Sequence, residues 1–398
     1  MNILFYCSEY PPYTTGGIGR VTKIVAETLA ARGHKVHIIG FYSSMPTVYE
    51  CSEENGVRVF RHKLDSMIEK KTLLFRCIRK LGLSRRIAQK QVDYVENIIN
   101  DHILKYNIDV FELTDFYPFV LLAPRLRFRD FPAHTVLRIH GSASFVQALS
   151  GKGKKYYVKN DSAHFSRCQS LLAVSQFSLK YVLDHYSLPE NIHKGVVYNP
   201  IDDNYLKMSE DKDDSILFIG KLIETKGCFS LARAFNIIAD KYPNTKLVFV
   251  GGGEQADLKK MIKEQYLNRV IFLGYCDRDK LTEVIDSCSF ACIPSYFENF
   301  SMVVLEVMAR GKTLIFTERT SGKEIIIDGV NGYTVNPEDE FEIASKLELL
   351  ICNRQLRMTL AKNAYKIIDE NYRATIIVDQ LESSYSYLLD KYNSVSYD

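Results

Sequence analysis

The amino-acid sequence predicts an α/β protein of two doubly wound, Rossmann-like domains, with a last helix that returns to the first domain. Two observations lead to this prediction. Short apolar strands alternate with amphipathic helices along the chain, as in parallel sheets with helices on both faces. After a polar stretch near residue 200 the same alternation starts again, and 398 residues are enough for two domains.

The first domain is predicted for residues 1–200. It opens with the apolar strand NILFYC, a loop rich in Gly and Pro, the amphipathic stretch VTKIVAETLAAR closed by Gly33, and the strand HKVHIIGF. Further strands are predicted at VRVFRH, VFELT, TVLRIH, SLLAVS and KGVVYN. Helical stretches separate these strands, so an open parallel sheet is expected.

The second domain is predicted for residues 201–374, and residues 199–214, which are rich in Asp and Lys, are predicted to be a linker. Strands are expected at SILFIG, KLVFV, VIFLG and FACIPS, and helices at CFSLARAFNIIADKYP, ADLKKMIKEQYL, KLTEVIDSC and SMVVLEVMAR. Residues 375–398 are expected to form the returning helix. Open α/β sheets bind ligands at the carboxyl ends of their strands, so two such sheets facing each other would hold a ligand in the cleft between them.

Composition and charge exclude several classes of protein. The formal net charge of +3 is too small to indicate nucleic-acid binding. The nine cysteines form no CxxC pair, and their odd number fits reduced thiols better than a disulfide framework. The N-terminal apolar run is too short for a signal peptide, and no stretch approaches the roughly 18 apolar residues of a spanning helix. A cytoplasmic location is expected.

A glycine-rich loop, TTGGIGR at residues 14–20, lies between the first strand and the first helix. Unpaired backbone N–H groups and the helix dipole favour an anion such as phosphate at this place. A dinucleotide fingerprint does not fit, because Thr22 stands where the third glycine belongs and the loop lies well beyond the strand end. The alternative is a flexible turn at the edge of the domain.

Two lysines follow the first strand of the second domain, Lys221 directly and Lys226 five residues later. Both ammonium groups could reach one diphosphate, although exposed lysines are usually only solvated surface. A Walker loop is excluded at Gly311-Lys312-Thr313, because Glu306 stands where its first glycine is required.

The stretch PSYFENFSMVVLEVMAR places two carboxylates around the start of a helix. With Ser301 as the expected N-cap, Glu298 precedes the helix and Glu306 lies about a turn and a half inside it. Carboxylates accept hydrogen bonds from hydroxyls, and helix N-termini bind phosphate. A nucleotide sugar, with phosphates between two hydroxylated rings, would satisfy both. The alternative is a solvent-exposed Glu306, which its apolar neighbours do not favour.

Several motifs in order give the chain a resemblance to the retaining glycosyltransferases with the GT-B fold and an E-x7-E motif, the glycosyl transferases of group 1, family 4 type. The motifs are the GG loop at Gly16 and Gly17, HG at 140–141, AVSQF at 173–177, VYNPID at 197–202, GKLIETKG at 220–227, GGG at 251–253, PSYFENFSMVVLE at 294–306 and DGVNGY at 328–333. Each motif is weak alone, but together they cover most of the chain.

The resemblance implies transfer of a sugar from a nucleotide sugar with retention at the anomeric carbon, without a bound metal or other cofactor. It implies that Glu306 binds the ribose hydroxyls and that Glu298 contacts sugar hydroxyls. The residues with implied catalytic roles are His140 against the transferring sugar, Glu298, and the lysines on the diphosphate, Lys221 and Lys226. The other implied donor-binding positions are Gly16, Gly17, Gly220, Gly274, Tyr275, Asn299, Phe300, Ser301 and Met302. Among these, Gly274 and Tyr275 would meet the base, and Gly16 and Gly17 would approach the phosphates or the acceptor.

The sequence departs from the family pattern at two positions. Lys221 stands where Arg is usual, and Lys lacks the planar fork that grips a phosphate through two hydrogen bonds. Asn299 stands where Gly is common, a minor change because Asn tolerates unusual backbone angles. No nucleophile is evident, which favours same-face attack by the acceptor over a covalent intermediate. Fixed positive groups on the departing diphosphate would stabilise the charge that grows in the transition state.

Residues 61–90 carry the basic clusters RHK, EKK, RCIRK and SRR between apolar residues. A basic amphipathic stretch can lie on an anionic membrane surface, which would suit a lipid-linked acceptor and a peripheral position at the inner face of the membrane. The patch RLRFRDF at residues 125–131 allows the same interpretation. The alternative for both is an ordinary surface helix with solvated charges.

Three functions stay open on the sequence alone. The first is a glycosyltransferase that uses a nucleotide sugar, with UDP expected as the commonest nucleotide, and a saccharide or glycolipid acceptor in polysaccharide or glycoconjugate synthesis. The second is a sugar-nucleotide epimerase or hydrolase on the same two-domain plan. The third is a non-catalytic protein that binds a nucleotide sugar, for which Lys221 in place of Arg is the only sign.

Overall fold

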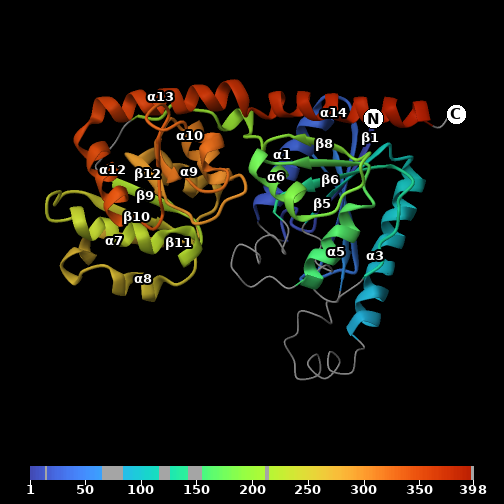
Figure 1. The fold of residues 1–398 in the computed structure, drawn as a ribbon, viewed down its shortest axis with the longest axis horizontal. Helices are drawn as coiled ribbons and strands as arrows, with labels where there is room; N and C mark the ends of the chain where they lie inside the picture. The colour runs from blue at the N-terminus through green and yellow to red at the C-terminus, as the bar shows by residue number, and fades with distance from the viewer. Residues whose placement is uncertain (14–15, 65–83, 116–125, 142–154, 211–214, 396–398) are drawn as a thin grey trace. The chain divides into compact units, whose positions relative to one another are not determined.

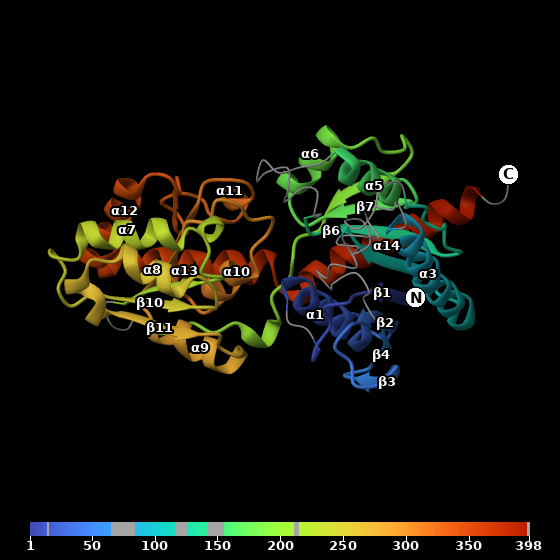
Figure 2. The same cartoon turned by 90° about the horizontal axis from the view of Figure 1, so that it is seen from below.

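The computed structural model describes the chain except residues 14–15, 65–83, 116–125, 142–154, 211–214 and 396–398. The chain divides into two compact units, residues 1–200 with 377–398 and residues 201–376. Each unit is a sheet with helices packed on both faces (Figures 1 and 2). The predicted fold class, two Rossmann-like parallel sheets with a C-terminal helix that packs on the first, is confirmed.

The sheet of the first unit has eight strands in the order β3-β4-β2-β1-β5-β6-β7-β8. These strands are β1 Asn2–Tyr6, β2 Lys35–Tyr42, β3 Tyr49–Glu54, β4 Val57–Lys63, β5 Val110–Thr114, β6 His134–Ile139, β7 Ser170–Ala173 and β8 His193–Val196. All pair in parallel except β3, which runs antiparallel to β4 at the edge. The sequence did not predict β3, because YECSEE has no apolar face.

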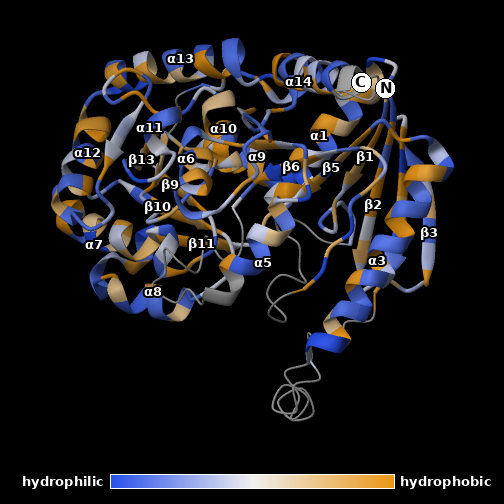
Figure 3. Ribbon diagram, turned by 45° about the vertical axis from the view of Figure 1, so that its right-hand side comes forward, coloured by the Kyte–Doolittle hydropathy of each residue, from blue (hydrophilic) through white to orange (hydrophobic). Residues whose placement is uncertain are grey.

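Five helices of the described chain belong wholly or mainly to the first unit: α1 Gly17–Ala31, α3 Ser84–Tyr106, α5 Lys155–Phe165, α6 Gln176–His185 and α14 Ala374–Val395. In α3 the buried residues Val92, Val95, Ile99 and Ile103 recur at helical spacing and join the core of the sheet. Figure 3 shows the same division, with apolar residues along the strands and polar residues on the outer helix faces.

The sheet of the second unit has six parallel strands in the order β11-β10-β9-β12-β13-β14. They are β9 Ser215–Ile219, β10 Lys246–Val250, β11 Val270–Gly274, β12 Phe290–Ile293, β13 Thr313–Thr317 and β14 Tyr333–Val335. The chain winds outward from β9 in one direction and then from β12 in the other. The sheet therefore has a topological switch point between β9 and β12, where open α/β sheets bind their ligands.

The helices of the second unit are α7 Cys228–Ile238, α8 Gln255–Met261, α9 Arg278–Ser287, α10 Met302–Ala309, α11 Gly322–Ile325, α12 Glu340–Cys352 and α13 Arg354–Asn371. The single helix predicted at ADLKKMIKEQYL is wrong. It breaks at Ile262, because the side chain of Asn236 donates to the carbonyl of Met261 and accepts from the N–H of Lys263. A 3-10 helix, Glu264–Arg269, follows the break.

The stretch predicted as a linker is packed against the second unit over its described part. Ile201 pairs with Arg373, and Tyr205 is buried with the guanidinium groups of Arg278 and Arg310 over its ring at 5.2 and 5.4 Å. The boundary between the two units falls in this stretch, as predicted, but residues 201–210 form an ordered segment of the second unit and not a flexible linker.

The C-terminal helix α14 is fixed to the first unit by buried and exposed polar contacts. The Tyr385 hydroxyl donates to Glu112 Oε2 at 2.5 Å, and both side chains are buried. At the surface, Arg32 Nη1 lies 2.5 Å from Asp379 Oδ1 and 2.6 Å from Glu382 Oε2. Among the helices of the described ranges, none has both the length and the apolar content needed to cross a bilayer.

Replacing Tyr385 by Phe should lower the free energy of unfolding by about 1–3 kcal/mol, because the buried Glu112 carboxyl would lose its donor without gaining water. Urea denaturation measures this change. Tyr387→Phe is the matched control on the same helix, since Tyr387 is 54% exposed and its hydroxyl can bond to water. Equal effects of the two substitutions would contradict a structural role of the Tyr385–Glu112 bond.

Candidate active site

Two loops meet at the switch point of the second sheet, residues 220–227 after β9 and residues 294–301 after β12. A short 3-10 turn, Glu224–Lys226, ends at Gly227, which has the left-handed angle φ 75°. A Cβ atom at Gly227 would lie 1.9 Å from the carbonyl oxygen of Pro294. Only glycine lets the two loops approach so closely, and this approach positions Lys226.

Lys226 and Glu298 form an ion pair across this contact, with Lys226 Nζ 2.7 Å from Glu298 Oε1. The Ser295 hydroxyl donates to the same oxygen at 3.0 Å. No described residue bonds the second carboxylate oxygen, Oε2. The Glu298 side chain is 12% exposed. One oxygen of Glu298 therefore holds Lys226 and Ser295.

The backbone of Glu298 is held by the loop after β13. Its N–H donates to Thr320 Oγ1 at 3.1 Å, and its carbonyl accepts from the Ser321 hydroxyl at 3.0 Å. Thr320 has φ 56°, an unfavourable angle for a β-branched residue that costs about 1–3 kcal/mol. This supporting loop was not identified from the sequence, since no motif connects TERTSG to the glutamate.

Helix α10 places Glu306 in the interior of the second unit, 1% exposed. The solvent-exposed alternative for Glu306 is therefore wrong. Ser301 is the N-cap residue, as predicted, but its side chain makes no capping hydrogen bond. The side chains of Phe300 and Met302 are buried. If these residues contact a nucleotide-sugar donor, they do so through their backbone groups. Asn299 is partly buried beside Glu298 in sequence.

The ends of β9, β10 and β11 are joined by close backbone contacts. A Cβ atom at Gly251 would lie 2.0 Å from the carbonyl oxygen of Gly220, and the N–H of Gly251 donates to the carbonyl of Gly274 at 2.7 Å. Lys221 has an exposed side chain that forms no ion pair with a described residue. Tyr275 is 73% exposed at the end of the edge strand β11. The predicted donor residues thus follow one edge of the sheet.

In the first unit, Asp115 fixes the backbone around His140. The N–H groups of His140 and Gly141 donate to its two carboxylate oxygens, each at 2.9 Å. Burial raises the pKa of Asp115 to about 7, against the effect of these two bonds. Burial, with the nearby Arg138, lowers the pKa of His140 to about 3, so its imidazole is neutral at pH 7. Asp115 was missed from the sequence, although it directly follows the strand VFELT.

The glycine loop of the first unit packs against Glu9. A Cβ atom at Gly16 would lie 2.0 Å from Glu9 Oε2, and one at Gly19 would lie 1.8 Å from the Glu9 carbonyl oxygen. Gly17, the first residue of α1, has open space around its Cβ position. Gly16 and Gly19 therefore serve the packing of the loop, whereas no described atom would crowd a side chain at Gly17.

The structure tests parts of the hypothesis that the basic patches at 61–90 and 125–131 lie on a membrane surface. The cluster at 61–63 belongs to β4, and Arg61 is buried, so this part of the membrane hypothesis is wrong. The clusters at 69–71 and 76–80 lie outside the described residues, and Arg85 and Arg86 are exposed at the start of α3. In the patch at 125–131 the apolar side chains are directed inward: Leu126 and Phe131 are buried.

Among the described residues, no group of three or more His, Cys, Asp or Glu side chains is arranged to hold a metal ion. The eight cysteines of those ranges are all free thiols.

Two Rossmann-like units in one chain, the second with a lysine–carboxylate pair at its switch point, are consistent with a glycosyltransferase of the GT-B fold, and the comparisons with known families show that class. Residues 15–205 match the family described as Glycosyltransferase Family 4, and residues 207–367 match Glycosyl transferases group 1. The chain belongs to this family, and the resemblance read from its motifs is confirmed.

Known relatives agree with this assignment. An uncharacterised glycosyltransferase of Methanocaldococcus jannaschii is 28% identical over 94% of both chains. The capsular polysaccharide biosynthesis glycosyltransferase CapM of Staphylococcus aureus is 29% identical, over 53% of this chain and 52% of its own. The crystal structure of Anabaena HepE in complex with UDP and glucose has a TM-score of 0.70 and 18% identity, and covers 97% of this chain and 99% of its own.

Asp115 should make stability depend on pH. Its pKa is about 7 in the folded state, against an ordinary value of 3.8. Between these values the folded protein holds a proton that the unfolded chain has released, so the free energy of unfolding should fall from about pH 4 to about pH 7 and then level off. In Asp115→Asn this fall should be smaller, because only the contributions of other buried carboxyls with raised pKa, Glu96 and Glu112, remain. Urea denaturation at several pH values tests this, with the exposed Asp101→Asn as control. A fall of the same size in Asp115→Asn would contradict the assignment.

Proposed function

We propose that this glycosyltransferase moves a sugar from a UDP-sugar to a saccharide or lipid-linked acceptor, with retention at the anomeric carbon. The observation that carries the proposal is the contact of Lys226 with Glu298 at the switch point of the second sheet, next to the helix that buries Glu306. A cation, two carboxylates and a helix N-terminus at one sheet edge suit a ligand with a diphosphate between two hydroxylated rings.

In this proposal the second unit binds the donor. Glu306 accepts hydrogen bonds from the ribose hydroxyls, for which a buried carboxylate is a strong acceptor. The N-terminus of α10 and the ammonium groups of Lys221 and Lys226 hold the diphosphate. The base lies near Gly274 and Tyr275, and the exposed ring of Tyr275 offers a surface for stacking.

In this proposal, catalysis comes from fixed positive charges of the enzyme that lie against the leaving diphosphate. The diphosphate gains negative charge as the glycosidic bond breaks, and Lys226 is already oriented by Glu298, so little reorganisation is needed. Glu298 Oε2 accepts from a hydroxyl of the sugar. The neutral imidazole of His140 can donate or accept a hydrogen bond at the transferring sugar without adding charge. The acceptor hydroxyl then attacks the anomeric carbon from the face that the diphosphate leaves, and its proton passes to the departing phosphate oxygen.

The choice of UDP and of a polysaccharide acceptor is supported by relatives. HepE is described in complex with UDP and glucose, and CapM is named for capsular polysaccharide biosynthesis. We assign acceptor binding to the first unit. The carboxylate of Glu9, packed on Gly16 beside the N-terminus of α1, favours hydroxyl groups over phosphate there, since a second anion would be repelled. We place the enzyme in the cytoplasm. In the two basic stretches proposed to lie on a membrane, the exposed basic residues of the described ranges are Arg85, Arg86, Lys90, Arg127 and Arg129.

Replacing Lys226 by Met should lower the kcat of acceptor-dependent sugar transfer by about 10²–10³-fold, because one donor to the developing charge is lost. Transfer is measured with UDP-, GDP- and ADP-sugars against saccharide and glycolipid acceptors. Lys280→Met, on the exposed face of α9 in the same unit, is the control and should leave kcat unchanged. Donor consumption at the same rate without acceptor would indicate a hydrolase or epimerase. No turnover with any donor would favour the non-catalytic alternative.

A further inference from the structure

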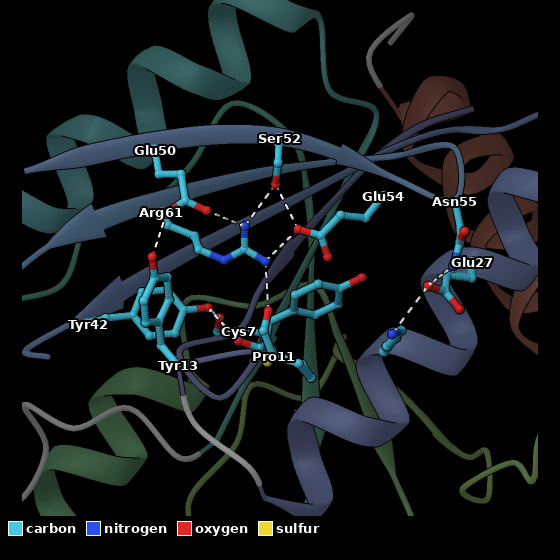
Figure 4. Close-up of polar contacts among 12 residues, drawn as sticks. Cys7, Pro11, Tyr13, Glu27, Tyr42, Glu50, Ser52, Glu54, Asn55 and Arg61 are labelled. Carbon is cyan, nitrogen blue, oxygen red and sulfur yellow. Dashed lines mark hydrogen bonds and ion pairs between the residues drawn. The ribbon is translucent and has the colours of Figure 1, made fainter. Parts of the chain in front are cut away.

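Arg61 is a buried cation on a strand that the family resemblance does not include. It lies on β4, directly opposite Glu50 of the antiparallel edge strand β3. Its side chain is 1% exposed. Glu50, Ser52 and Glu54 alternate along β3, so all three lie on one face of the hairpin. In Figure 4 their side chains converge on the guanidinium group from the β3 side.

The contacts of the guanidinium group divide between its two terminal nitrogens. Nη1 donates to Glu50 Oε1 at 3.0 Å and to Ser52 Oγ at 2.8 Å. Nη2 donates to Glu54 Oε1 at 2.7 Å and to the carbonyl oxygen of Pro11, also at 2.7 Å. Pro11 belongs to the loop between β1 and α1. The planar fork of Arg61 thus connects the hairpin to this loop.

The same loop is held by three tyrosines around the cation. The Tyr13 hydroxyl donates to Glu50 Oε2 at 2.6 Å. The rings of Tyr10 and Tyr13 each lie 5.9 Å from the Arg61 Cζ atom, within cation–π range. The Tyr42 hydroxyl, from β2, donates to the carbonyl oxygens of Cys7 and Tyr10. Residues 10–13 are therefore attached to the hairpin through Pro11 and Tyr13, and to β2 through the bond of Tyr42 to the Tyr10 carbonyl.

This loop continues to the glycines at the start of α1. Glu9, two residues before Pro11, packs directly on Gly16 and Gly19, leaving no room even for a Cβ atom. A shift of Pro11 therefore moves Glu9 against the N-terminus of α1. The proposed function assigns the first unit, and with it the glycines of this loop, to the acceptor.

We propose that Arg61 is a positioning residue for the transfer reaction: it sets the place of the loop at residues 9–13, and through Glu9 that of the glycines at the N-terminus of α1. The proposal rests on the proposed function. The polar face of β3 serves this arrangement, because its two glutamates balance a buried charge that would otherwise oppose folding. Lysine would not replace arginine, since a single ammonium nitrogen cannot hold Glu50, Glu54 and Pro11 in one plane.

The test uses the full chain with Arg61→Lys, Arg61→Met and the control Arg58→Met. Arg58 lies on the same strand, but its side chain is 56% exposed and its only ion pair among the described residues, with Glu53, is 3.8 Å long. We expect kcat/KM for the acceptor to fall by about 10²-fold in Arg61→Met, the loss typical of a misplaced reacting group, and by less in Arg61→Lys. Arg58→Met should match the wild type.

Two further measurements separate positioning from loss of stability. UDP binding, followed by its thermal shift, should be retained in the Arg61 variants, because the donor residues lie in the second unit. Hydrogen exchange should quicken in peptides covering residues 7–13 and 16–20 in Arg61→Met, and not in Arg58→Met. If Arg61→Met does not fold, Arg61→Lys decides the matter by the same measurements.

The outcomes are distinct. If the wild type transfers sugar and both Arg61 variants have the same kcat/KM as the wild type, the positioning proposal is overturned and the proposed function stands. If hydrogen exchange in the loop is the same in the Arg61 variants as in the wild type, the positioning proposal is overturned as well, even if the variants are less active. Absence of transfer and of UDP binding in the wild type would instead remove the proposed function on which it rests, and the positioning role with it.

Discussion

The candidate site depends on one constraint of the second sheet: its parallel strands wind outward in two opposite directions. All strands of such a sheet end at one edge, so the loops after β9 and β12 must meet where the winding reverses. This places Lys226 next to Glu298, although 72 residues separate them in the sequence. The same rule brings Asp115, after β5, to the backbone of His140, after the neighbouring strand β6.

Carboxylates act in this chain as anchors as well as candidate ligands. Asp115 uses both of its oxygens on backbone N–H groups, and Glu112 accepts from Tyr385. Glu298 uses one oxygen on Lys226 and Ser295, and in the proposed function its other oxygen accepts from a sugar hydroxyl. A site built in this way is ordered before the substrate arrives, which reduces the cost of organising charge during the reaction.

The sequence predicted what depends on short-range pattern and missed what depends on pairing at a distance. Apolar periodicity located most strands, and the apolar neighbours of Glu306 indicated its burial correctly. By contrast, RHK at 61–63 was interpreted as part of a surface stripe, because only the pairing of β3 with β4 places three polar side chains around Arg61. Asp115 and Thr320 act through backbone contacts with residues distant in the sequence, which leave no local signal. The break in the helix at Ile262 depends on Asn236 in the same way.

The central claim is that Glu306 binds the ribose of a nucleotide at the switch point of the second unit. The most direct measurement is calorimetric titration of wild type and Glu306→Gln with UDP and with 2′,3′-dideoxyuridine diphosphate. In the wild type, loss of the ribose hydroxyls should weaken binding by about 1.5–3 kcal/mol, the worth of hydrogen bonds to a charged group. In Glu306→Gln this difference should shrink to a small fraction. An equal difference in both proteins, or none in the wild type, would contradict the account.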